Sequence, residues 1–339
     1  MKTICPLGKF VLIAGLTLGI SSCSGGGEVA PVSAPPSATT NQTKPVSRDL
    51  LQDGGIFTWP IASMPPNFNY YELDGLSRDN HIVIAALMPS VVHHTADGTP
   101  LWNRDMLVSE PTFVTERQQM VTYQINPDAT WYDGTPITWE DFYWQWQACS
   151  GENSQYRNGS TNGYENIGMI ERGANDHEVI VTYETPFADW QGLFDPLYPM
   201  STNSDPEIFN DGWRERPLTT AGPFKLENID VTAQTITLVR NEKWWGETAK
   251  LDRIVFRAIN FDAQIDALAN GEIDAMDIGP DANTYNRARG IANVEIRTAG
   301  GPNFRHITIN GSSPKLQDVR VRKALAMGID RSVIARAML

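Results

Sequence analysis

The stretch of residues 219–277 changes its hydrophobic period partway along, and this constrains the fold more than any other feature of the chain. Between residues 224 and 240, and again between 254 and 259, apolar and polar residues alternate as they do in half-buried strands. From Phe261 the apolar residues recur at helical spacing until Gly271, after which a new apolar segment begins. The pattern predicts a compact α/β unit in the middle of the chain.

Length and charge set broad limits on the class of protein. At 339 residues the chain is long enough for two domains and a large core. It has 27 Lys and Arg residues against 40 Asp and Glu residues, which gives a net charge of −13. Because a surface this acidic repels phosphate groups, we expect no nucleic-acid partner.

The first residues are typical of an exported bacterial protein. Lysines near the start precede residues 10–20, which are uncharged, mostly apolar and too few to span a bilayer as a helix. The run Ile20-Ser21-Ser22-Cys23 resembles the lipobox of bacterial lipoproteins, in which the cysteine thiol receives a diacylglycerol and becomes the mature N-terminus. We therefore predict a lipoprotein signal peptide over residues 1–22 and lipidation of Cys23. Ordinary secretory cleavage beside an incidental cysteine is the alternative.

Residues 23–49 are rich in Gly, Ser, Thr and Pro and have few large apolar side chains, so they cannot bury enough surface to fold. We expect a flexible tether that holds the folded part at the outer face of the cytoplasmic membrane, with Cys23 as the lipid anchor. Cleavage removes Cys5 and acylation occupies Cys23, so Cys149 is the remaining free thiol. Stability must then come from the core and not from disulfides.

The segments before residue 219 predict further strands and helices. Residues 56–59 are strand-like, and residues 82–88 are apolar enough for a buried helix. Turn signals at 97–100 and 133–136 bracket an alternating segment at 121–125, which indicates a meander of antiparallel strands.

Thr138 is placed to cap a helix, with Asp141 three residues on as a short form of the capping box. The helix carries several aromatic side chains. Phe142 and Trp146 share one face of it, and we interpret them as core residues; a platform for a sugar or a base is the alternative.

The later segments are less regular. Residues 186–217 form a long irregular run with several aromatic side chains, and loops of that length are often functional. Phe304, Ile307 and Ile309 suggest a strand, and residues 316–339 suggest a helix or a helix pair.

Catalytic and metal-binding patterns are weak in this sequence. His93 and His94 would point to opposite faces of a strand, and the structural interpretation is that they end a strand beside a turn. Glu140-Asp141 lies in the first turn of the predicted helix, where acidic side chains favour the helix dipole. No nucleophile elbow, phosphate loop or dinucleotide fingerprint is present. We predict no metal site, no cofactor and no enzymatic activity.

Four blocks of sequence resemble, in order, those of the family 5 extracellular solute-binding proteins, the oligopeptide and dipeptide receptors of ABC importers. The blocks are residues 121–125 with WYDGTPITWED at 131–141, AGPFKL at 221–226, LVRNEKWWG at 238–246, and DVRVRKAL with IDR between 318 and 331. The resemblance extends over roughly residues 53–339, and the four blocks in family order make it specific although no single block would suffice.

The resemblance implies an α/β fold of periplasmic-binding-protein-like type II, with a discontinuous mixed-sheet main lobe and an inserted small domain. Domain I would comprise residues 50–77 plus 218–297, with the strand near 54–59 joining the central sheet, which would keep an unpaired edge. Domain II would comprise residues 78–217. Residues 298–339 would start a third domain, which we expect to be incomplete because relatives continue well beyond the last block.

The resemblance also implies a few ligand-binding residues. The backbone of Leu73, Asp74, Gly75 and Leu76 could pair with an extended peptide by strand addition. Asn303 and Phe304 lie at the entry to the third domain, and Tyr156 could line the small domain. Each residue has a structural alternative as part of a turn, a strand or loop packing, and for Tyr156 we favour that alternative.

The leading hypothesis is a lipid-anchored substrate-binding component of an ABC importer that binds peptides or similar small solutes and delivers them to permease subunits. An alternative is an envelope lipoprotein that uses the same fold as a regulatory or scaffold partner in cell-envelope biosynthesis, without transport. A hydrolase is a third possibility, with the weakest support.

Overall fold

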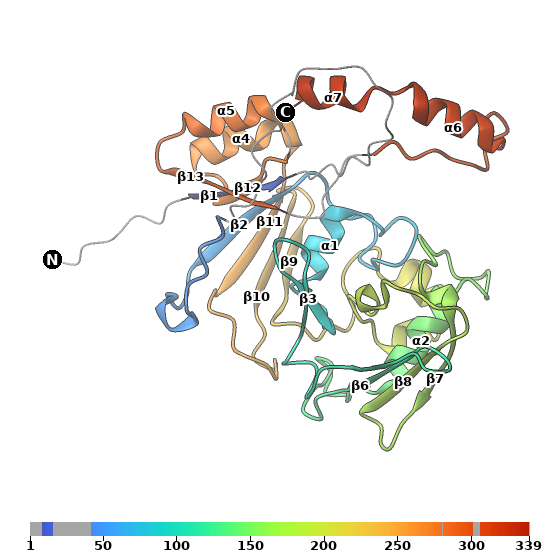
Figure 1. The fold of residues 1–339 in the computed structure, drawn as a ribbon. Coiled ribbons are helices and arrows are strands. Elements are labelled where there is room, and N and C mark those ends of the chain that lie inside the picture. The colour runs from blue at the N-terminus through green and yellow to red at the C-terminus, as the bar shows by residue number, and fades with distance from the viewer. Residues whose placement is uncertain (1–8, 16–41, 280, 301–305, 339) are drawn as a thin grey trace. The chain divides into compact units, whose positions relative to one another are not determined.

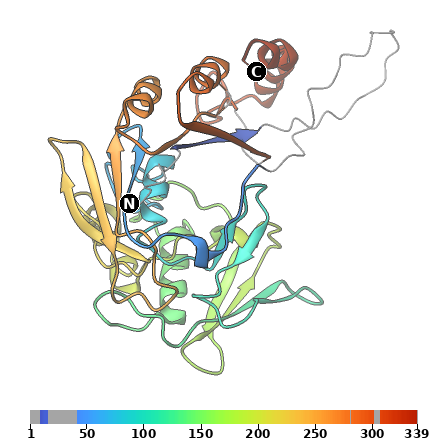
Figure 2. The same cartoon turned by 90° about the vertical axis from the view of Figure 1, so that its left-hand side faces the viewer.

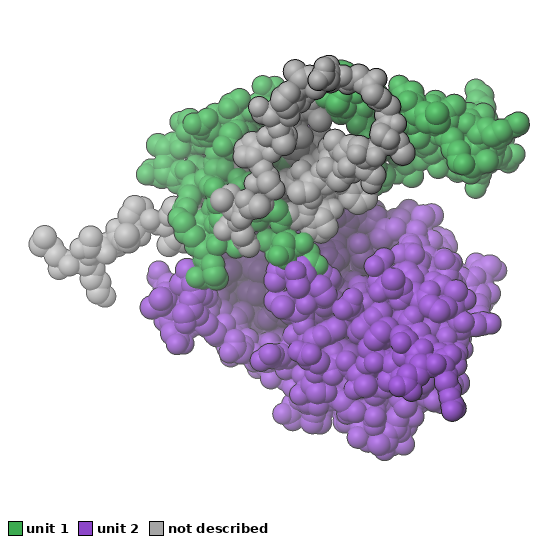
Figure 3. Space-filling view, viewed as in Figure 1, with its two compact units in different colours: residues 1–45, 96–98, 265–339 green, residues 46–95, 99–264 purple. Residues whose placement is uncertain are grey.

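The computed structural model describes residues 9–15, 42–279, 281–300 and 306–338 (Figure 1). Contacts divide the chain into two compact units, which Figure 3 colours separately. Unit 2 comprises residues 46–95 and 99–264, and unit 1 comprises residues 1–45, 96–98 and 265–339.

The first sheet of unit 2 joins segments that are far apart in the sequence. Its strands, in order across the sheet, are β2 (Ile56–Ile61), β11 (Arg253–Ala258), β10 (Thr235–Arg240) and β9 (Phe224–Asp230). β2 is parallel to β11, with Phe57 opposite Ile254, and the other pairs are antiparallel. The predicted pairing of the early strand with the central unit is therefore confirmed. Among the described residues β2 and β9 are the edge strands of this sheet. The sequence predicted that the sheet would have an unpaired edge.

The second sheet of unit 2 is antiparallel throughout. Its order is β5 (Thr112–Val114), β6 (Met120–Gln124), β8 (Glu178–Tyr183) and β7 (Ile167–Arg172). A separate hairpin joins β3 (Val92–His94) to β4 (Pro100–Trp102). His93 and His94 therefore end a strand before a turn, as the structural interpretation of these two residues predicted.

Helix α2 (Trp139–Cys149) packs against the second sheet, beside β7 and β8 (Figures 1 and 2). Thr138 and Asp141 form the predicted capping box. Phe142 and Trp146 are buried on the inner face of the helix together with the thiol of Cys149. The core interpretation of this aromatic helix is confirmed.

The other helical segments of unit 2 are short. The predicted helix at 82–88 is in fact α1 (Arg78–Ile84): Ser77 caps it, and residues 85–88 continue as turns. The rest are α3 (Met200–Asn203), a π-helix (Ile208–Gly212) and 3-10 turns (Arg48–Leu50, Tyr164–Asn166, Trp190–Gly192).

Unit 1 has a parallel sheet in the order β12 (Ala275–Asp277), β1 (Lys9–Gly15) and β13 (Val294–Gly300). β1 comes from the segment predicted as an export signal, so removal of residues 1–22 would leave β12 and β13 without their shared partner. Helix α4 (Phe261–Asn270) crosses the division between the units and ends at Gly271, whose φ of 77° is the left-handed conformation that the predicted helix stop requires.

The C-terminal part of unit 1 is helical. Its helices are α5 (Ala282–Arg289), α6 (Val319–Gly328) and α7 (Arg331–Met338), and the last two confirm the predicted helix pair. The predicted strand around Ile307 and Ile309 is wrong for residues 306–310, which are irregular, and Ile307 is exposed. Phe304 lies outside the described residues. No helix in the described part of the chain has the length and apolar character needed to cross a membrane.

Candidate ligand-binding site

Unit 2 contains two cavities that adjoin at the side chain of Asp195. The histidine cavity has a volume of about 280 Å³, and its lining includes His81 and His93. The tyrosine cavity has a volume of about 320 Å³, and its lining includes Tyr70 and Tyr164. We take the pair as the candidate site, because small ligands bind in concave sites that carry a few convergent polar groups.

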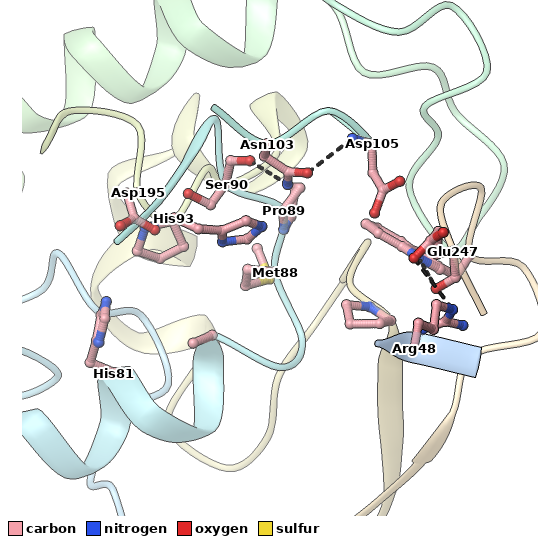
Figure 4. A pocket seen from close by; sticks show the side chains of 14 residues that line it. Arg48, His81, Met88, Pro89, Ser90, His93, Asn103, Asp105, Asp195 and Glu247 are labelled. Atoms are coloured by element: carbon pink, nitrogen blue, oxygen red, sulfur yellow. Dashed lines mark hydrogen bonds and ion pairs between the residues drawn. The ribbon is translucent and has the colours of Figure 1, made fainter. Parts of the chain in front are cut away.

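The histidine cavity has charged groups of both signs (Figure 4). At one end Nε of Arg48 lies 3.4 Å from a carboxylate oxygen of Glu247. His81, His93 and Asp195 line the other end, where His81 lies apart from the other two in this view. A solute that carries both an amino group and a carboxylate could therefore meet an opposite charge at each end of the cavity.

The wall of the histidine cavity is fixed by its own hydrogen bonds. Nδ2 of Asn103 donates to the carbonyl oxygen of Ser90 at 2.8 Å. The Ser90 hydroxyl donates to the carbonyl oxygen of Val92 at 2.6 Å and accepts from the Val92 N–H. This hydroxyl closes a backbone turn and is not held by a base as a nucleophile would be.

A ring contact between His81 and Tyr70 lies between the two cavities. The ring of His81, on helix α1, lies 4.9 Å from the ring of Tyr70, measured between centroids. Tyr70 lines the tyrosine cavity and His81 lines the histidine cavity, so this ring contact forms part of the partition between them.

The tyrosine cavity has aromatic walls with a hydrogen-bonded backing. The Tyr71 hydroxyl donates to the carbonyl oxygen of Pro196 at 2.9 Å, and the Tyr164 hydroxyl donates to the Tyr71 oxygen at 3.2 Å. Burial, more than any other effect, raises the pKa of both Tyr71 and Tyr164 above the ordinary tyrosine range. These hydroxyls therefore remain protonated donors at neutral pH.

The predicted peptide-pairing segment Leu73–Leu76 is a tight turn whose N–H groups are all engaged. Leu73 donates to the Arg157 carbonyl oxygen, Asp74 to a Glu72 carboxylate oxygen, and both Gly75 and Leu76 to the Glu72 carbonyl oxygen. Strand addition at this turn would have to use its carbonyl groups. Leu76 lines the tyrosine cavity, whereas Leu73 and Asp74 do not line either cavity.

A buried carboxylate holds this turn in place. Glu72 is 1% exposed, and its Oε1 lies 3.2 Å from Nε of Arg157 and 4.0 Å from a terminal nitrogen of Arg214. Its Oε2 accepts from Nδ2 of Asn67 at 3.0 Å. Arg214 also pairs with Asp74 at 2.8 Å, which ties the turn to the segment after the π-helix.

Of the remaining predicted site residues the structure describes Tyr156, which lines neither cavity. Tyr156 is buried, its hydroxyl donates to the Asn203 carbonyl oxygen at 2.8 Å, and its ring meets Phe209 edge to face. This is the loop packing that we favoured for Tyr156. Cys23, Asn303 and Phe304 lie outside the described residues.

Sequence reasoning missed Asp195 and His81, although a signal existed for the first. Asp195 lies in the long irregular run of residues 186–217, whose length marked it as a functional loop. His81 gives no such signal, since a single histidine in a helix has no pattern around it. Within the described ranges, no group of three or more His, Cys, Asp or Glu side chains could hold a metal ion.

Comparison with known proteins identifies the family. The model of the bacterial extracellular solute-binding proteins, family 5 (middle region), matches residues 105–339. The chain belongs to this family. The resemblance found in the four sequence blocks is thereby confirmed, and the family consists of solute-binding proteins and not of enzymes.

Curated members of the family are similar to this chain over nearly its whole length. The oligopeptide-binding protein OppA of Mycobacterium tuberculosis is 36% identical over 326 residues, which cover 94% of this chain and 55% of OppA. A probable monoacyl phosphatidylinositol tetramannoside-binding protein of the same organism, LpqW, is 28% identical over 344 residues, which cover 99% of this chain and 52% of LpqW. The chain thus spans about half the length of these relatives.

A solved structure of the family confirms the fold class. The periplasmic EDTA-binding protein EppA superposes with a TM-score of 0.72 at 28% identity, covering 89% of this chain and 57% of EppA. The chain therefore has the predicted α/β fold of periplasmic-binding-protein-like type II.

Proposed function

We propose that this protein is the lipid-anchored, extracytoplasmic substrate-binding component of an ABC importer, and that it binds peptides. The observation that carries the proposal is the pair of adjoining cavities, which brings Arg48 and the carboxylates of Asp195 and Glu247 to one site. Charges of both signs suit a solute with an amino and a carboxyl terminus. The 36% identity to OppA, named an oligopeptide-binding protein, supports the same solute class.

Binding would act through a change of conformational population. A solute that contacts the closed arrangement more extensively than the open one shifts the protein toward closure by its differential affinity. Permease subunits would then recognise the closed form. The domain bounds that we expect for this motion remain residues 50–77 plus 218–297 for domain I, 78–217 for domain II, and 298–339 for the start of domain III.

Calorimetry on the full gene product tests the peptide proposal. We expect heat of binding with di- to pentapeptides, and much weaker binding when both peptide termini are capped by acetylation and amidation. No heat with any peptide, together with binding of a sugar, nickel, haem or a glycolipid, would assign the protein to another solute class.

The lipid anchor has its own test. When cells that express the protein are fed an alkyne-labelled fatty acid, the label should attach to the wild-type chain and be lost in Cys23→Ser. Cys149→Ser is the matched control, because its thiol is buried and burial raises its pKa well above the ordinary range, so it should keep the label. No label on wild type or on Cys23→Ser would argue for ordinary secretory cleavage, and equal label on both would mean that the fatty acid is attached at another residue.

A second candidate function is a regulatory or scaffold role in cell-envelope biosynthesis without transport. The 28% identity to LpqW, whose name refers to a mannosylated phosphatidylinositol, favours this alternative. Affinity capture from membranes would separate the two functions. Recovery of permease subunits supports import, whereas recovery of a glycosyltransferase without a permease supports the scaffold role.

A further inference from the structure

The Asp195 carboxylate has no hydrogen-bond or ion-pair partner among the described residues, although it is half-buried and lines both cavities. Carboxylates that are withdrawn from water usually have a donor or a cation beside them. Tyr70 lines the tyrosine cavity together with Asp195, and both burial and the negative charge of Asp195 raise the pKa of Tyr70. The position of this carboxylate suits a cation supplied from outside the chain.

The lining of the tyrosine cavity has the composition of a cation site. It combines aromatic rings with two carboxylates and contains no lysine, arginine or histidine; the aromatic and acidic members are Tyr70, Tyr71, Tyr164, Phe187, Asp189 and Asp195. Aromatic faces attract ammonium and guanidinium groups and also cover the methylene groups of a side chain. Asp189 is exposed and Asp195 is half-buried, which leaves Asp195 as the more enclosed charge.

Hydrogen bonds on both sides hold the backbone around Asp195. The preceding residue, Phe194, is buried with a left-handed φ of 59°, a conformation that is costly for an aromatic residue. Its N–H donates to the Tyr164 oxygen at 2.9 Å. On the other side, the Pro196 carbonyl oxygen accepts from Tyr71 at 2.9 Å and from Nε2 of Gln145 at 3.1 Å. A carboxylate held in this way binds a cation without ordering its own loop.

We propose that the tyrosine cavity receives the lysine or arginine side chain of a bound peptide, with Asp195 as its counter-ion and the aromatic rings as its walls. This inference rests on the proposed function and narrows the substrate class to peptides with a cationic side chain. A volume of about 320 Å³ lies at the lower end of the range for small-molecule sites, which suits one side chain and not a whole peptide.

The test measures the affinity of two series of alanine pentapeptides. In the first series lysine occupies each of the five positions in turn, and in the second series norleucine replaces the lysine. Norleucine keeps the methylene chain and lacks the ammonium group. For at least one position, wild-type full gene product should bind the lysine peptide about tenfold more tightly than its norleucine partner. In Asp195→Asn this ratio should fall to about one, while the norleucine affinity stays within about twofold of wild type.

Two further variants complete the design. Asp128→Asn removes the same charge from an exposed position outside both cavities and should keep the wild-type ratio. Tyr70→Leu keeps Asp195 and removes one aromatic wall, so the ratio should fall by about threefold, which tests the cavity even if Asp195→Asn does not fold.

The possible outcomes distinguish a failure of the cation site from a failure of the proposed peptide-binding function. If every norleucine peptide binds as well as its lysine partner, or if Asp195→Asn keeps the preference, the cation site is wrong and peptide binding stands. If Tyr70→Leu keeps the full ratio, the tyrosine cavity is not where the cation binds. If wild type binds neither series, the proposed function fails and the inference fails with it.

Discussion

Nδ2 of Asn241 donates a 2.8 Å hydrogen bond to the carbonyl oxygen of Gly222, and this contact locks two of the family's sequence blocks together. The Asn241 N–H adds a bond to the Pro223 carbonyl oxygen at 2.9 Å. Gly222 in turn donates its N–H to the Leu87 carbonyl oxygen at 2.7 Å, just beyond α1. These hydrogen bonds join the first sheet to the residues that follow the helix carrying His81. The two sequence blocks therefore help to hold the wall of the histidine cavity in place.

Asn241→Ala should destabilise the protein. Asn241 is 5% exposed, and its loss leaves the Gly222 carbonyl oxygen and the Lys243 N–H without their side-chain partner. We expect the free energy of unfolding to fall by about 1–3 kcal/mol, measured by chemical denaturation. The control Asn270→Ala, at an exposed helix end, should change it by less than about 0.5 kcal/mol. Equal effects in the two variants would contradict the proposed supporting role of Asn241.

Gly75→Ala should disturb the turn beside the tyrosine cavity. A Cβ atom at this position would lie 1.8 Å from the carbonyl oxygen of Asn69, so the backbone must move. We expect a loss of about 3 kcal/mol in the free energy of unfolding, and weaker peptide binding because Leu76 lines the cavity. Gly328→Ala is the matched control, since its Cβ would meet no atom within 4 Å and Gly328 lines neither cavity. A stable Gly75→Ala variant would show that the turn is looser than described.

Arg157→Met should lower the free energy of unfolding more than Arg172→Met does, although both arginines are about half exposed. Arg157 pairs with the buried carboxylate of Glu72 as well as with the exposed Asp211, whereas Arg172 pairs with the exposed carboxylate of Asp176. Removing Arg157 leaves a buried charge less compensated, and we expect a loss of about 2 kcal/mol. Removing Arg172 should cost less than about 1 kcal/mol. Thermal denaturation of the two variants in one buffer makes the comparison, and a larger loss for Arg172→Met would refute it.

Asp141 should make stability depend on pH in the weakly acidic range. Burial raises its pKa from 3.8 to about 6, although N–H donors of Thr138, Met200 and Trp131 oppose the shift. The folded state therefore binds the proton more tightly than the unfolded state, so the stability contributed by the protonated group is complete below pH 3.8 and is lost as pH rises toward about 6. We expect the advantage of wild type over Asp141→Asn to shrink by about 3 kcal/mol across this window.

Denaturation curves recorded between about pH 4 and 7 measure this difference. Asp128→Asn, at an exposed position, should show a flat difference from wild type. An Asp141→Asn difference that grows with pH would mean that the hydrogen bonds to the carboxylate outweigh its burial.

The sequence predicted most of the regular structure because strict periodicity carries that information. The alternation in β9, β10 and β11 and the capped start of α2 came directly from apolar spacing and capping chemistry. The strand expected from Phe304, Ile307 and Ile309 failed at residues 306–310. Phe304 and Ile307 are three apart, an odd spacing that would place them on opposite faces of a strand.

The candidate site was harder to predict because it depends on contacts between irregular segments. For Leu73–Leu76 a turn was one structural alternative to peptide pairing, but the engaged N–H groups of this turn depend on Glu72 and on Arg157, which is far away in the sequence. Asp195 lies in a run without periodicity, and its place between two cavities follows from the packing of Tyr71 and Tyr164 around it. Loop length indicated the functional region but could not select the residue.

Photo-crosslinking tests the central claim, that a peptide binds at the two cavities of unit 2, most directly. A lysine-containing pentapeptide with a photo-reactive leucine would be irradiated with the full gene product, and the modified residues would be mapped by mass spectrometry. The account predicts that cross-links which excess unlabelled peptide suppresses fall on the lining of the two cavities, around Asp195, Tyr70 and His81. Suppressible cross-links confined to residues outside these linings would contradict it.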